Sequence, residues 1–132
     1  MKVFINSYST VYQRGGGGVP MRIRTISSGL KERGIDVQLF NTWEDKLKDA
    51  DILHIFKATI DSYAEIMYAK ECGVKVVLSS VVPQEGQGKI RLGLVLHKFF
   101  RINNTISYLK SELLAADAVI AQTQKEASFI NK

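Results

Sequence analysis

Short, predominantly apolar segments recur along this chain and alternate with stretches of helical periodicity. The predicted strands are at residues 3–5, 37–40, 51–56, 74–79 and 117–121. Apolar runs of this length are typical of strands buried in a parallel sheet. Their alternation with helices predicts an α/β fold, and right-handed crossovers then place helices on both faces of the sheet. We therefore expect a Rossmann-like, doubly wound parallel sheet.

Turn-forming and capping residues mark where the intervening helices begin and end. Gly34 ends the first predicted helix, and Gly73 closes a second one over residues 61–72. Thr123 is placed to cap a last helix. Residues 43–48 are predicted to form a short surface helix or a turn.

The order of strands in such a sheet decides where a ligand binds. Ligands lie beyond the carboxyl ends of the strands, at the point where the strand order reverses. We expect this point at the loops after the first and fourth predicted strands. The first of these loops contains Gly15, Gly16, Gly17 and Gly18. Glycines before a helix present backbone N–H groups to an anion such as phosphate; the alternative is a flexible connector.

The standard phosphate-binding motifs fit this loop poorly. A Walker loop ends in Gly-Lys-Ser/Thr, whereas Val19, Pro20 and Met21 follow the glycines. A dinucleotide-binding fingerprint requires a glycine where Pro20 stands. A receiver domain needs acidic residues after its first strand, and this chain has Asn6 and Ser7 there.

Several segments occur in a recognisable order. They are the strand MKVFINSY, the glycine loop, and the stretches SSGLKERGIDVQLF, DADILHIF, AKECGVKVVLSS and LLAADAVIAQTQKEASFI. This order resembles the N-terminal domain of GT-B-fold retaining glycosyltransferases, the glycosyltransferase family 4-like group, over nearly the whole chain. The resemblance implies a hexosyltransferase-like enzyme that moves a sugar from a nucleotide-sugar to a polysaccharide or lipid-linked acceptor.

The resemblance also implies how the active site is divided. The cleft would lie between two Rossmann-like domains, of which residues 1–132 form the acceptor-side one. The glycines Gly15, Gly16, Gly17 and Gly18 would meet the donor diphosphate. No metal or cofactor is expected, with the nucleotide-sugar as co-substrate. The donor domain would follow Lys132, so we expect the truncated chain alone to be inactive.

Other residues are candidates for the acceptor side of the cleft. Lys57 ends the third predicted strand on the ligand-facing side, and Ser79 and Ser80 occupy the loop after the fourth. Similar enzymes often carry a histidine after that strand, which this chain lacks. The helix that Thr123 begins faces the cleft in similar enzymes. His54, within the third strand, is a candidate catalytic residue, with packing as the alternative.

The positive charge of the chain is concentrated in one segment. The net charge is +5, and residues 89–110 hold basic side chains but no acidic one. Among them, Lys89, Arg91, Lys98 and Arg101 alternate with bulky apolar residues. Such a helix lies on an anionic membrane surface, or it packs on the sheet with its basic side chains reaching outward. The segment has no nucleic-acid-binding motif, and we expect no nucleic acid as partner.

The remaining composition sets the class of protein. A chain of 132 residues suits one compact domain. No segment approaches a membrane span and the first residues turn polar too early for a signal peptide, so a cytoplasmic protein, peripheral at the membrane, is expected. Uncovered apolar surface predicts a homo-oligomer. The competing interpretation is a stand-alone nucleotide- or phosphate-binding α/β module without catalytic activity.

Overall fold

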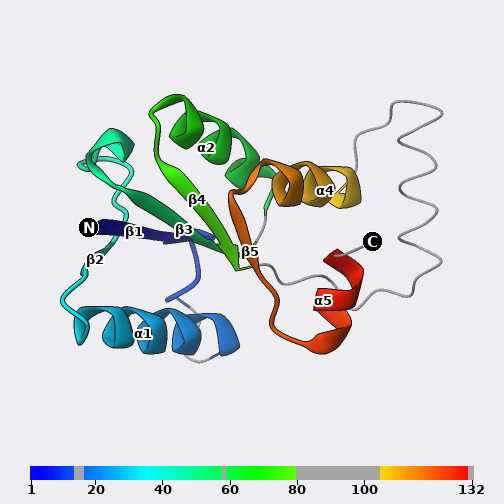
Figure 1. Ribbon diagram of the computed structural model, residues 1–132, viewed down its shortest axis with the longest axis horizontal. Helices are drawn as coiled ribbons and strands as arrows, with labels where there is room; N and C mark the ends of the chain where they lie inside the picture. Colours follow the sequence, from blue (N-terminus) through cyan, green and yellow to red (C-terminus); the bar gives the residue numbers. More distant parts are fainter. Residues whose placement is uncertain (14–16, 58, 80–104, 131–132) are drawn as a thin grey trace.

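The computed structural model describes residues 1–13, 17–57, 59–79 and 105–130. These residues form a five-stranded, all-parallel sheet of order β2-β1-β3-β4-β5 with helices on both faces (Figure 1). The strands are β1 (Lys2–Ser7), β2 (Asp36–Leu39), β3 (Ile52–Phe56), β4 (Lys75–Ser79) and β5 (Ala118–Ile120). The helices are α1 (Gly18–Lys31), α2 (Ile60–Glu71), α4 (Thr105–Ala115) and α5 (Gln124–Ile130). The predicted parallel α/β fold is therefore confirmed.

Side chains of β1 alternate between the two faces of the sheet and belong to two hydrophobic cores. Phe4 packs with Ile66 and Ala69 of α2 on one face. Val3 and Ile5 point to the other face. There they pack with the buried α1 residue Ile23. Because successive residues of a strand face opposite sides, a strand buried on both faces reads as the continuous apolar run seen in the sequence.

Helix α1 covers one face of the sheet, and α2 and α4 cover the other (Figure 1). Helix α2 begins with a capping box in which Thr59 and Ser62 satisfy each other's backbone N–H groups. It ends before Gly73, whose φ of 78° is the left-handed conformation that glycine adopts readily. Gly34, with φ of 74°, follows α1 in the same way. Both predicted helix ends are confirmed.

The predicted site of strand reversal is wrong in one respect. The order β2-β1-β3-β4-β5 reverses between β1 and β3, so the two loops at this point follow β1 and β3. The loop after β4, expected there, is two strands removed from β1. Residues 43–48 contain turns that lead into a short 3₁₀ helix, Leu47–Asp49. No helix within the described residues has the length and apolar content to cross a bilayer.

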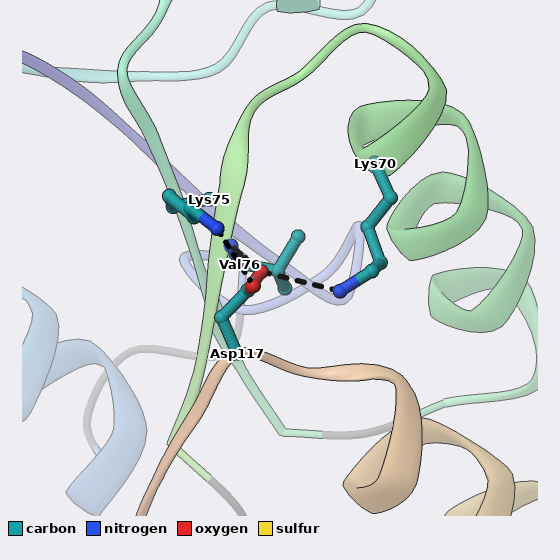
Figure 2. Close-up of polar contacts among 4 residues, drawn as sticks. All are labelled: Lys70, Lys75, Val76 and Asp117. Atoms are coloured by element: carbon teal, nitrogen blue, oxygen red, sulfur yellow. Dashed lines mark hydrogen bonds and ion pairs between the residues drawn. The ribbon is translucent and has the colours of Figure 1, made fainter.

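Lys70, Lys75 and Asp117 form a charged cluster at the amino ends of β4 and β5 (Figure 2). The Asp117 carboxylate accepts the backbone N–H of Val76 at 3.0 Å and lies 3.2 Å from Nζ of Lys75. Nζ of Lys70, from α2, lies 3.4 Å from Oδ2, the oxygen that accepts the Val76 N–H. The Val76 hydrogen bond is the main cause of a lowered pKa for Asp117, and the lysines add to it. This cluster lies at the edge of the sheet opposite to the carboxyl ends of the strands.

Candidate functional site

A cavity of about 450 Å³ opens at the carboxyl edge of the sheet, where β1 and β3 lie side by side. Its walls come from the end of β1 and the loop after it, α1, the end of β2 and the residues after it, the end of β3 and the residues after it, and the first turns of α2. The polar and aromatic residues among them are Asn6, Ser7, Tyr8, Ser9, Tyr12, Phe40, Thr42, Lys57, Thr59, Asp61, Ser62 and Glu65. The cavity is thus at the reversal point of the strand order, where α/β proteins bind ligands.

A hydrogen-bonded pair joins two walls of this cavity. Nδ2 of Asn6, in β1, donates to Oε1 of Glu65, in α2, at 2.6 Å. Oδ1 of Asn6 accepts the backbone N–H of Ser7 at 2.8 Å, which fixes the orientation of the amide. The Ser7 hydroxyl in turn donates to the Phe56 carbonyl at 2.6 Å. Burial raises the pKa of Glu65, and the hydrogen bond from Asn6 opposes this shift.

Lys57 occupies a strained position at the end of β3. Its φ of 73° is in the left-handed region, and no other non-glycine residue among those described has a positive φ. Its backbone N–H donates to the Ser79 carbonyl at 3.1 Å. Its ammonium lies over the Tyr8 ring, 4.5 Å from the centroid. Strain of this kind costs about 1–3 kcal/mol and is concentrated at functional sites.

His54 lies inside the sheet and outside the lining of the cavity. Its Nε2 is 2.8 Å from Oγ of Ser79, and its ring stacks on Phe56 with centroids 4.2 Å apart. Burial, assisted by the charge of Arg22, lowers its pKa to about 4, so the imidazole is neutral. Ser79 is fully buried and also outside the lining. The two side chains therefore contact each other in the interior and do not line the cavity.

A buried carboxyl group supports the cavity wall from behind. Glu112 of α4 is only 1% exposed, and its Oε1 lies 2.6 Å from Oγ of Ser62. The same hydroxyl lies 2.6 Å from the Thr59 carbonyl. The Ser62 hydroxyl donates to the Glu112 carboxyl group, with the Thr59 carbonyl as an alternative acceptor for its single hydrogen. Burial raises the pKa of Glu112 to about 7, and the hydrogen bonds from the Ser62 hydroxyl and the Thr59 backbone oppose this rise.

The glycine loop is described only at its end, because Gly15 and Gly16 lie outside the described residues. Gly17 is the N-cap of α1, with φ of 135°, and a Cβ on it would meet Pro20 at 3.6 Å. A Cβ on Gly18 would have no neighbour within 4 Å. Neither glycine belongs to the cavity lining, although Ile23 of α1 does.

The other predicted site residues are placed elsewhere or are not described. Thr123 caps α5, as predicted, because its Oγ1 accepts the backbone N–H of Glu126 at 3.1 Å; it is not in the cavity lining. Ser80 and the membrane-surface candidates lie outside the described residues; the latter are Lys89, Arg91, Lys98 and Arg101. Within the described part of the chain no cluster of side chains suits a metal ion.

Trp43 is 93% exposed. It follows Thr42, which lines the cavity, and its backbone N–H donates to Oδ1 of Asn41 at 3.1 Å. The backbone of Asn41 is held by Asp45, whose Oδ2 accepts its N–H at 2.8 Å. A loop tied by its own hydrogen bonds therefore presents the indole to solvent.

Sequence reasoning missed Asn6, Glu65 and Glu112. The signals are visible in retrospect. Asn6 ends the first predicted strand, and Asp61, Ser62 and Glu65 share one face of a helix by their spacing. Glu112 is an acid three residues after Leu109 and directly before Leu113, on an otherwise apolar helix face.

No protein-family model, curated protein or solved structure matches the chain.

Proposed function

We propose that this chain is the acceptor-side domain of a nucleotide-sugar glycosyltransferase. The observation that carries the proposal is the position and lining of the cavity at the β1–β3 reversal point. An amide, carboxylates, hydroxyls and tyrosine rings line it together, a combination suited to a ligand with many hydroxyl groups. The resemblance of the sequence to GT-B N-terminal domains adds the class of enzyme.

The start of α1 is the place proposed for the donor diphosphate. Gly17 and Gly18 leave the first N–H groups of α1 without side chains above them, and such groups favour anions. The nucleotide and the donor sugar would be held mainly by a second domain, in which case this domain contributes backbone amides and the acceptor pocket.

The test is calorimetric titration of UDP, GDP and their sugar conjugates. We expect no tight binding by residues 1–132 alone, and tight binding by a chain that also carries a donor domain. Sugar transfer by that longer chain to a saccharide acceptor would establish the activity. Tight nucleotide binding by the 132 residues themselves would instead identify a self-sufficient nucleotide-binding module and overturn the proposal.

A membrane-bound acceptor is the second part of the proposal. It rests on the sequence of the basic segment, which includes Lys89, Arg91, Lys98 and Arg101. We expect the chain to sediment with vesicles containing phosphatidylglycerol and not with vesicles of phosphatidylcholine alone. Replacement of these four residues by glutamine would abolish sedimentation. Equal sedimentation by the variant and the native chain would contradict this part.

A further inference from the structure

We infer that the cavity binds a phosphorylated saccharide, with the Asn6–Glu65 pair contacting two neighbouring sugar hydroxyls and Lys57 contacting the phosphate. The inference rests on the proposed function for the ligand being a saccharide. The contacts of Asn6, Glu65 and Lys57 in the structure are the basis for assigning the first two to sugar hydroxyls and the third to the phosphate.

The Asn6–Glu65 pair offers one donor and one acceptor side by side. Asn6 uses one N–H for Glu65 and its carbonyl oxygen for Ser7, which leaves the second N–H of its amide. Glu65 uses Oε1 for Asn6, and within the described residues its Oε2 has no hydrogen-bond partner. Adjacent hydroxyls of a sugar ring present the complementary arrangement, because each hydroxyl both donates and accepts. A ligand with isolated polar groups would leave one of the two atoms unsatisfied.

Lys57 brings a positive charge to the cavity and makes no direct ion pair within the described residues. Asp61 and Glu65 line the same cavity. No carboxylate among the described residues forms an ion pair with Lys57, whose ammonium rests on the Tyr8 ring instead. A cation–π contact at an exposed site is weak, so an anion displaces it readily. The strained backbone holds this residue at the cavity although glycine would fit there without strain.

The phosphate has two possible sources with the same chemistry. It belongs either to a free sugar phosphate or to a lipid-linked one. A soluble hexose 1-phosphate and a short-chain polyprenyl phosphate sugar distinguish them, since tighter binding of the second indicates additional contacts with the lipid.

Nuclear magnetic resonance of the ¹⁵N-labelled chain tests the inference. The probes are the 1-phosphates of glucose, galactose, mannose and N-acetylglucosamine, the four parent sugars, and inorganic phosphate, each titrated to millimolar concentration. We expect at least one sugar phosphate to shift the side-chain NH₂ signals of Asn6 and the backbone signal of Lys57. The parent sugar should bind about tenfold more weakly, as expected for the loss of a charge-assisted contact. Absence of any shift at Asn6 across this panel would overturn the inference.

Matched variants assign the two contacts separately. Glu65→Gln should weaken both the sugar phosphate and its parent sugar by about tenfold, whereas Lys57→Met should weaken the sugar phosphate alone. Glu71→Gln, on the exposed side of α2, and Lys48→Met, at an exposed lysine outside the cavity lining, are the controls and should change neither. Equal weakening by a variant and its control would contradict the assignment.

The inference and the proposed function fail in different ways. Sugar phosphate binding at Asn6 without any sugar transfer by a chain carrying a donor domain would refute only the glycosyltransferase. Sugar transfer with a KM for the acceptor that Glu65→Gln leaves unchanged would refute only the assignment of the cavity.

Discussion

The carboxylate of Asp117 accepts the backbone N–H of Val76 at 3.0 Å, so a side chain just before β5 satisfies a backbone group at the amino end of β4. This contact supplements the sheet hydrogen bonds between the two strands. It also gathers Lys70 and Lys75 on the same carboxylate, so that α2, β4 and β5 meet at one charged group (Figure 2).

Asp117→Asn should lower the free energy of unfolding by on the order of 1 kcal/mol, because it weakens a charge-assisted hydrogen bond and removes the partner of both lysines. The native pKa of Asp117 is lowered, so its contribution is present above the pKa of the unfolded chain. It is lost as the pH falls through the native value. Urea unfolding at pH 7 and pH 3 measures both effects. Asp49→Asn, at an exposed aspartate, is the control, and an equal loss in the two variants would contradict the role of Asp117.

Glu112 should make the protein less stable as the pH rises. Burial raises its pKa from 4.5 to about 7. The unfolded chain therefore loses the proton first, and the stabilisation present below pH 4.5 is lost as the pH rises through about 7. The full loss is roughly 3 kcal/mol.

Glu112→Gln should remove this loss, because the amide keeps an oxygen that accepts the Ser62 hydroxyl and does not ionise. Urea unfolding from pH 5 to pH 8 should show native stability falling and variant stability remaining nearly flat. Glu71→Gln, at an exposed position of α2, should retain the native pH dependence. Parallel curves for the native chain and Glu112→Gln would show that the carboxyl group is ionised throughout.

The two described glycines of the loop before α1 should respond differently to alanine. Gly17→Ala places a Cβ on a residue with φ of 135°, which should destabilise the fold by about 1–3 kcal/mol. Gly18→Ala adds a Cβ in open space at the first residue of α1 and should stabilise it by up to about 1 kcal/mol. Thermal unfolding of the two variants measures the difference. Similar melting temperatures would mean that Gly17 relaxes freely into another conformation.

Relief of the strain at Lys57 should stabilise the domain. Lys57→Gly removes the penalty for φ of 73° and should raise the free energy of unfolding by about 0.5–1 kcal/mol, after the greater entropy of glycine in the unfolded chain is subtracted. Lys57→Ala keeps the strain and removes the contact with Tyr8, so it should give no increase. Chemical denaturation compares the three chains. Equal stability of the glycine and alanine variants would show that the backbone here is not strained.

The sequence predicts the strands well because each one is a short apolar run. It does not predict the order of the strands in the sheet. Strands buried on both faces are all continuous apolar runs, and such runs do not indicate which strand pairs with which. For this reason the sequence predicts the reversal of strand order at the loop after β4, whereas it lies between β1 and β3. Phe4 and Val3 point to opposite faces of the sheet. Which helix each of them contacts is known only when the helices are placed on their faces.

The candidate site was predicted in part. Lys57 was identified from its place at the end of a strand, which is a local property. The contact between Asn6 and Glu65 joins residues 59 positions apart and exists because β3 pairs with β1, which brings α2 beside the end of β1. Ser79 was assigned to the site from its position, but its side chain points to His54 in the interior. The direction of a strand's last side chain depends on register, which the sequence alone does not determine.

Trp43 is the single tryptophan of the chain, and its indole is 93% exposed while the loop beneath it is tied by hydrogen bonds. Its fluorescence in the native protein should therefore already be that of a hydrated indole and change little on denaturation. The same emission should shift to shorter wavelength when another molecule covers the indole. The emission wavelength of Trp43 therefore changes little when the protein unfolds, and it reports contact with another molecule.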